Sequence, residues 1–129
     1  MYNSQWYNSL TKPVFAPASS VFTPAWIFLY TTIIISLILF IFTNSEINKK
    51  AGYIYFSIQM ILNIIWSPVF FGLQDILSAL IIILFLDVFT VLTIIEFYKV
   101  SKIAGLVLIP YFLWLLFATY LNFGYLILN

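Results

Sequence analysis

Four long apolar segments constrain the fold of this chain more than any other feature of its sequence. They cover residues 21–42, 51–71, 76–97 and 103–128. Each is close to the roughly 20 residues that a helix needs to cross about 30 Å of hydrocarbon. Short connections between them favour helices that run up and down in one bundle. The sequence therefore predicts an all-α integral membrane bundle of four transmembrane helices, forming a single domain over residues 1–129.

The few charged residues agree with a membrane location and indicate an orientation. Charged side chains make up 7% of the chain, whereas a soluble domain carries about 25%. Lys49 and Lys50 lie in the loop 43–50, Lys99 and Lys102 lie in the loop 98–102, and Lys12 stands alone on the other side. The positive-inside rule then predicts that the two Lys-bearing loops are cytoplasmic and that both termini lie on the opposite side.

Two absent residue types narrow the possible functions. The chain contains no His and no Cys, so it has no disulfides, no Ser–His or Cys–His catalysis, and none of the commonest metal ligands. Its four acidic residues are scattered along the chain, which argues against an enzyme and against a metal site. Haem iron would have only Tyr or Met60 as an axial ligand. A net charge of +1 at pH 7 gives no reason to expect a nucleic-acid partner.

A polar and aromatic stripe interrupts the second apolar segment. Gln59, Asn63 and Trp66 are spaced by four and then three residues, which places them on one helix face, and Pro68 follows them. Unpaired amides in hydrocarbon cost several kcal/mol each. We therefore expect the stripe to face a neighbouring helix or a ligand cavity, and for Gln59 a bond to a neighbouring helix is the alternative to a place in a cavity wall.

The fourth apolar segment carries a second face of this kind. Pro110 removes a backbone donor, so a kink is expected there. The residues on the shared face follow steps of three and four: Tyr111, Trp114, Ala118, Leu121 and Tyr125. A small residue between large aromatic ones leaves room for a neighbouring helix or for a flat ligand, and both interpretations stand.

Residues 1–20 also have two interpretations. Their Trp, Tyr and Lys12 side chains suit an anchor at the membrane interface. Alternatively, the segment forms a lid over the end of the bundle, with Lys12 as the counter-charge of an anionic ligand. Composition alone favours the anchor.

Asp87 is the carboxylate expected deep within a membrane span. Such a residue is a functional candidate by default. It can instead be protonated and hydrogen-bonded to Thr90 or to a neighbouring helix, or the span can be shifted so that Asp87 meets water. Glu96 and Lys99 are expected to form a surface ion pair of little energetic value.

Three motifs occur in order along the chain, and together they are specific. They are Trp6-Tyr7-x-x-Leu10-x-Lys12-Pro13, then Leu62-Asn63 with Trp66, Pro68 and Phe70-Phe71-Gly72, and then Pro110-Tyr111-x-x-Trp114-x-x-Phe117-Ala118-Thr119-x-Leu121-Asn122. With these motifs the chain resembles the tryptophan-rich sensory protein/translocator protein family, also called the peripheral benzodiazepine receptor family. The resemblance extends from Trp6 to Asn122.

The resemblance implies a membrane receptor or sensor that binds tetrapyrroles, such as protoporphyrin IX or haem, in a cavity inside the bundle. No resident cofactor is implied. The residues expected to bind the ligand are Lys12, Phe22, Trp26, Asn63, Trp66, Phe85, Trp114, Ala118 and Leu121. A porphyrin is a flat aromatic disc with two carboxylates, so it favours ring faces and a cation at its rim. Two alternatives are a transporter of porphyrins or other amphipathic ligands, and light-dependent porphyrin degradation through Trp26 and Trp114.

Family members normally have five helices, and the helix without a counterpart here precedes the Trp6-Tyr7 motif. Residues 1–5 cannot span a bilayer. The chain is then either a shortened form or part of a longer protein. In either case the cavity would open to lipid on one side unless another subunit fills it, so self-association, as a dimer, is expected.

Overall fold

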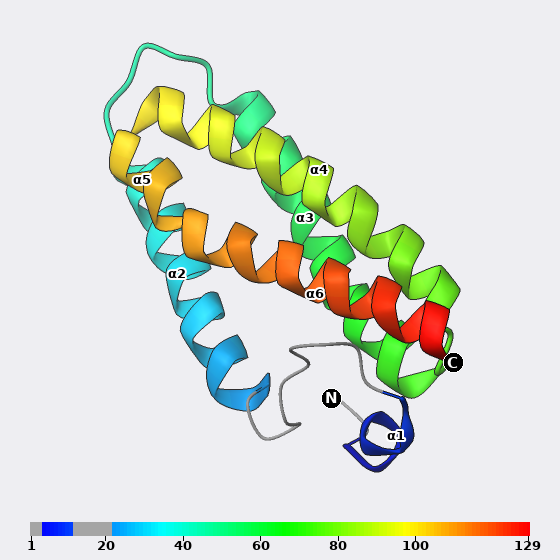
Figure 1. Cartoon of the computed structure of the whole chain (residues 1–129). Helices are drawn as coiled ribbons and strands as arrows, with labels where there is room; N and C mark the ends of the chain where they lie inside the picture. Colours follow the sequence, from blue (N-terminus) through cyan, green and yellow to red (C-terminus); the bar gives the residue numbers. More distant parts are fainter. Residues whose placement is uncertain (1–3, 12–21) are drawn as a thin grey trace.

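The computed structural model describes residues 4–11 and 22–129, and every regular element within these residues is a helix (Figure 1). In chain order the elements are α1 (Ser4–Ser9), α2 (Phe22–Phe42), α3 (Lys50–Ser67), the short π-helix η2 (Pro68–Gly72), α4 (Ile76–Val100), α5 (Lys102–Val107) and α6 (Ile109–Leu128). Four stretches of this part of the chain are long and apolar enough to cross a membrane: Pro24–Phe42, Lys50–Gly72, Ile76–Val100 and Lys102–Leu128. The predicted all-α membrane bundle is confirmed.

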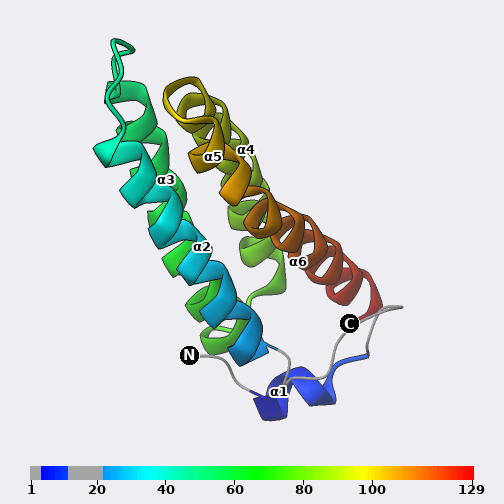
Figure 2. The same cartoon turned by 90° about the vertical axis from the view of Figure 1, so that its left-hand side faces the viewer.

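The bundle is arranged around α4. This helix packs against α3 on one side and against α5 and α6 on the other, while α2 packs against α5 and the neighbouring part of α6. The connection between α2 and α3 and the junction of α4 with α5 lie at one end (Figure 1). The C-terminus and α1 lie at the opposite end, where α1 crosses below the long helices (Figure 2). The outward faces are apolar, since at most 33% of each membrane-spanning window is buried inside the bundle.

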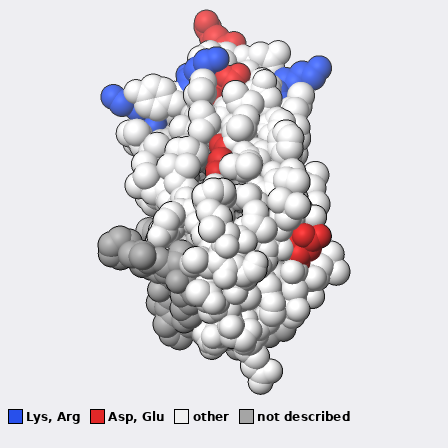
Figure 3. All heavy atoms as spheres, turned by 45° about the vertical axis from the view of Figure 1, so that its right-hand side comes forward, with Lys and Arg blue, Asp and Glu red and all other residues white. Residues whose placement is uncertain are grey.

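The described lysines gather at one end of the molecule. Figure 3 shows their side chains at the end formed by the α2–α3 loop and by the start of α5, with no Lys on the sides of the bundle in that view. We call this the lysine end, and we call the end that carries α1 the α1 end. At the lysine end the stacked rings of Phe40 and Phe97 are 4.0 Å apart, and Ser36 Oγ donates a hydrogen bond of 2.6 Å to the carbonyl of Ala104. These contacts fix the second half of α2 to α4 and α5.

Local sequence signals set several helix boundaries. Asp75 caps the start of α4: its carboxylate accepts from Ser78 N at 3.0 Å and from Ser78 Oγ at 2.8 Å. These two donors hold the pKa of the exposed Asp75 carboxyl below its usual range. Gln74 in the preceding turn has a φ of 57°, which lets the chain reverse between η2 and α4.

The expected kink near Pro110 is a break between two helices. α5 ends at Val107, and Leu108 N donates to the carbonyl of Gly105 at 3.2 Å, which tightens that last turn. Pro110 then falls in the first turn of α6, where a backbone N–H has no partner within the helix. The interruption therefore stands two residues before the proline.

Candidate functional site

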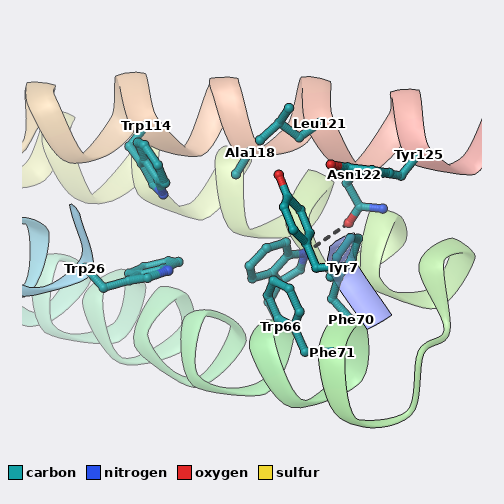
Figure 4. A pocket seen from close by; sticks show the side chains of 10 residues that line it. All are labelled: Tyr7, Trp26, Trp66, Phe70, Phe71, Trp114, Ala118, Leu121, Asn122 and Tyr125. Carbon is teal, nitrogen blue, oxygen red and sulfur yellow. Dashed lines mark hydrogen bonds between the residues drawn. The ribbon is translucent and has the colours of Figure 1, made fainter. Parts of the chain in front are cut away.

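An aromatic pocket lies inside the bundle near the α1 end (Figure 4). Its walls come from α1, α2, α3, η2 and α6. The lining residues are Tyr7, Trp26, Trp66, Phe70, Phe71, Trp114, Ala118, Leu121, Asn122 and Tyr125. The cavity measures about 10 Å³, which is room for about one water molecule. Side chains therefore fill most of the pocket in this conformation.

Three tryptophans from three helices meet in this pocket. The ring centroid of Trp26 on α2 lies 6.4 Å from that of Trp66 on α3 and 6.5 Å from that of Trp114 on α6. Trp66 also stacks on Phe70 of η2 at 5.3 Å, with 24° between the ring planes. Such offset and edge-on pairs stabilise aromatic clusters beyond the burial of their surface. The cluster offers ring faces and edges to any flat aromatic guest.

Helix α1 contributes Tyr7 to the pocket wall at the α1 end. Tyr7 is 1% exposed, and its ring lies 5.2 Å from Tyr125 on α6 and 6.1 Å from Phe71 on η2. The neighbouring Trp6 packs edge-on against Phe70 at 5.2 Å. Burial raises the pKa of the Tyr7 hydroxyl, and its contact with Tyr125 opposes part of that rise. The aromatic residues of α1 thus belong to the core of the bundle end.

The side-chain amide of Asn122 is hydrogen-bonded within the otherwise apolar wall of the pocket. The indole Nε1 of Trp66 donates to Asn122 Oδ1 at 3.0 Å, and Asn122 Nδ2 donates to the carbonyl of Ile76 at 2.9 Å. Asn122 is fully buried. These bonds join α3, α6 and the start of α4, and they fix the orientation of the Trp66 ring.

A second polar network crosses the bundle through Asn63. Tyr30 on α2 donates to Asn63 Oδ1 at 2.5 Å, and Asn63 Nδ2 donates to the hydroxyl of Tyr111 at 2.8 Å. Tyr111 in turn donates to Gln59 Oε1 at 2.8 Å. Gln59 and Asn63 are both buried. The predicted stripe therefore divides: its two amides bond neighbouring helices, and Trp66 lines the pocket.

Removing the central hydroxyl of this network should destabilise the bundle. Tyr111→Phe leaves Asn63 Nδ2 and Gln59 Oε1 without their partner, and a buried polar group left unpaired costs about 1–3 kcal/mol. Tyr30→Phe is the matched control, since Tyr30 is only partly buried and donates a single bond. We expect thermal unfolding in detergent, followed by circular dichroism, to show the larger loss for Tyr111→Phe. Equal losses would contradict the central place of Tyr111.

The structure brings together most of the residues expected at the site. Trp26, Trp66, Trp114, Ala118 and Leu121 all line the pocket. Asn63 is buried beside it, with its amide engaged by Tyr30 and Tyr111. Lys12 and the side chain of Phe22 lie outside the described residues.

Phe85 does not line the aromatic pocket in this structure, and its expected role in ligand binding stays a prediction. It is 57% exposed and lines an apolar hollow of about 250 Å³ on the outer face of α4, together with Ile81, Leu84 and Val88. The steps of three and four between these residues put them on one face of α4. The buried residues Ala79, Ile83 and Leu86 occupy other positions around the same helix.

Five lining residues were not expected at the site: Tyr7, Phe70, Phe71, Asn122 and Tyr125. Signals for them were present, since all but Tyr125 belong to the three motifs and Tyr125 shares the helix face of Trp114 and Ala118. Their assignment required knowing that α1 and η2 fold against the end of α6. Among the described residues, no group of three or more acidic side chains is placed to hold a metal ion.

Comparison with known proteins identifies the family. The sequence matches the TspO/MBR family over residues 1–128. The chain belongs to the TspO/MBR family. It is 41% identical to a tryptophan-rich protein TspO of Chlorobaculum tepidum, over 98% of this chain and 80% of that protein. It is 33% identical to a tryptophan-rich sensory protein of Cereibacter sphaeroides, over 97% of this chain and 77% of that protein.

The TspO/MBR relatives extend to animals. The chain is 32% identical to the human translocator protein, over 92% of this chain and 72% of that protein. Family membership and the four apolar helical stretches together make this an integral membrane protein of the sensory and translocator group.

Proposed function

We propose that the aromatic pocket is a receptor site for a tetrapyrrole, with protoporphyrin IX as the leading ligand and haem as a second. The observation that carries the proposal is the cluster of Trp26, Trp66 and Trp114, which present indole rings from three helices to one pocket. A mostly apolar, aromatic lining with one oriented amide suits a planar ligand that stacks. The names of the relatives, tryptophan-rich sensory protein and translocator protein, agree with a ligand-responsive role.

Binding of a tetrapyrrole requires the pocket to open. A cavity of about 10 Å³ is far below the roughly 300–1,000 Å³ of typical ligand sites. The second half of α2 is fixed by the Ser36–Ala104 bond and by the Phe40–Phe97 stack. Toward the α1 end, α2 is held by the Tyr30–Asn63 bond, by the ring contacts of Trp26 and by the burial of Leu29. The first half of α2, with α1, is therefore the part expected to move.

The carboxylates of a porphyrin need a cation, and Lys12 is the proposed one. The described lysines lie at the lysine end, away from the pocket (Figure 3). The residue before Lys12 is tethered at the α1 end, because Thr11 N donates to Asn129 Oδ1 at 3.0 Å and Asn129 Nδ2 donates to Thr11 O at 3.1 Å. Lys12 itself lies outside the described residues, so its proposed role rests on its position in the sequence directly after Thr11 and on the preference of a carboxylate for a cation.

The binding proposal is tested by filling the small position in the pocket wall. Ala118 is 4% exposed and lines the pocket, so Ala118→Leu occupies ligand space. We expect protoporphyrin IX to quench the tryptophan fluorescence of the wild type saturably, and the affinity to fall at least about tenfold in the variant, or about 1.4 kcal/mol. Phe85→Leu is the control, because Phe85 lies on the outer face of α4. Absence of saturable quenching in the wild type, or equal affinities for wild type and Ala118→Leu, would refute the proposal.

Several further assignments stay predictions. Transport of a porphyrin and light-dependent degradation through Trp26 and Trp114 both presuppose the binding step. The lysine end is proposed to face the cytoplasm by the positive-inside rule. Self-association through the apolar outer surface, as a dimer, is likewise proposed.

A further inference from the structure

Asp87 stands near the middle of α4, within a membrane-spanning stretch and outside the aromatic pocket. Its Oδ2 atom lies 2.6 Å from Thr119 Oγ1 on α6. The contact bridges two helices, so the neighbouring-helix alternative for Asp87 is the one observed. The distance lies within the usual range of O–H···O hydrogen bonds, about 2.5–3.0 Å.

Two oxygen atoms compete for the single proton of the Thr119 hydroxyl. Thr119 Oγ1 also lies 2.8 Å from the carbonyl oxygen of Leu115, one turn earlier on α6. A hydroxyl has a single proton, and a carbonyl oxygen can only accept. If the hydroxyl proton points to Leu115 O, as is usual for a helical Thr, then the proton in the shorter contact must come from the Asp87 carboxyl.

The second carboxyl oxygen leads to the same conclusion. Asp87 Oδ1 is buried and has no hydrogen-bond partner among the described residues. An ionised carboxylate would leave charge on this oxygen without a protein donor to stabilise it, which is costly in a low-dielectric interior. In the neutral acid, Oδ1 is a carbonyl-type oxygen that tolerates the missing donor better.

No cation in the described residues compensates for a charge at this position. Lys99 is paired with Glu96 at 2.9 Å in the last turns of α4. Lys102 on α5 is exposed. From α6, the ionisable group that interacts with Asp87 is Tyr111, which carries no positive charge. From α3, Tyr55 packs against Phe89 two residues away on α4. These ionisable groups are therefore neutral phenols, a paired lysine and an exposed lysine.

We propose that Asp87 is an intramembrane proton-binding site, in which the neutral carboxyl donates from Oδ2 to Thr119 and thereby joins α4 to α6. Thr119 directly follows Ala118 of the pocket wall. Loss of the proton would require the Thr119 hydroxyl to turn from Leu115 O to the carboxylate, and it would leave a negative charge between the two helices beside the pocket. The site rests on this geometry and does not depend on what the pocket binds.

Infrared spectroscopy of the whole chain in lipid at pH 7 tests the proposal. The chain contains two aspartates, Asp75 and Asp87, so ¹³C-aspartate labelling isolates their carboxyl bands. We expect one protonated-carboxyl C=O band, which Asp87→Asn removes and Asp75→Asn leaves in place. Asp75 is the matched control, because it is exposed and accepts two hydrogen bonds from Ser78 as a carboxylate.

A third variant tests the hydrogen-bond partner. Thr119→Val removes the acceptor, so the Asp87 band should shift to higher frequency, whereas Thr119→Ser should leave it near the wild-type position. Two results would overturn the proposal: only ionised aspartate bands in the wild type, or a protonated band that Thr119→Val does not move.

Discussion

Trp66→Ala should abolish saturable protoporphyrin binding and lower the free energy of unfolding by about 3–5 kcal/mol, the range for deleting a large aromatic side chain from a core. Trp66 is 5% exposed, stacks on Phe70 at 5.3 Å and meets Phe71 edge-on at 6.0 Å. Its removal would open a cavity between η2 and α6 and leave Asn122 Oδ1 without its donor. Fluorescence titration and thermal unfolding in detergent measure the two effects on the same preparation.

Trp66→Phe separates the ring from its hydrogen bond. The smaller ring keeps an aromatic face for stacking but loses the indole N–H that bonds Asn122 at 3.0 Å. We expect the loss in stability to be smaller than for alanine, within the about 1–3 kcal/mol of one buried unpaired group, and binding to be weakened but measurable. Unaltered protoporphyrin affinity in Trp66→Ala would show that Trp66 is a purely structural residue.

Gly105→Ala should destabilise the junction of α4 with α5 by about 1–3 kcal/mol, the usual cost of overpacking. An added Cβ would lie 2.8 Å from Tyr98 Cβ and 3.0 Å from both the Cα and the N of Tyr98. These atoms belong to the backbone of α4 or lie next to it, so they cannot turn aside as a side-chain tip can. The α5 segment would have to move away from α4, and with it the Ser36–Ala104 contact that holds α2.

Gly72→Ala is the matched control for Gly105→Ala. An added Cβ at Gly72 meets no atom within 4 Å, so its effect should stay within about 0.5 kcal/mol. Thermal unfolding of both variants in the same detergent compares them directly. Equal melting temperatures would mean that α5 can shift away from Tyr98 at little cost in stability, which would contradict the prediction.

Several features of the site were predictable from local sequence. The spacing of Gln59, Asn63 and Trp66 placed them on one buried face, and the steps from Tyr111 to Tyr125 did the same on α6. Both predictions use only the helical period, which holds wherever a helix forms. Phe85 was assigned by resemblance, and the structure places it on the outer face of α4, because a resemblance fixes neither which helix face a residue occupies nor what that face contacts.

The long-range partners were not predictable. Tyr30 reaches Asn63 from 33 positions away, and Trp66 reaches Asn122 from 56. Such pairs depend on how far each helix is rotated and shifted along its neighbour. The packing of many side chains sets those quantities together, and no short stretch of sequence records them.

What the sequence by itself determined is that this chain crosses a membrane as a helical bundle. Apolar segments of about 20 residues must satisfy their backbone groups internally in lipid, and a helix does so within one segment. Only the tertiary structure decided how the polar and aromatic stripe is used: its two amides bond Tyr30 and Tyr111, while Trp66 enters the pocket beside Asn122. The reason is that each of these side chains faces the bundle interior, and the partner it meets there depends on the positions of the other helices.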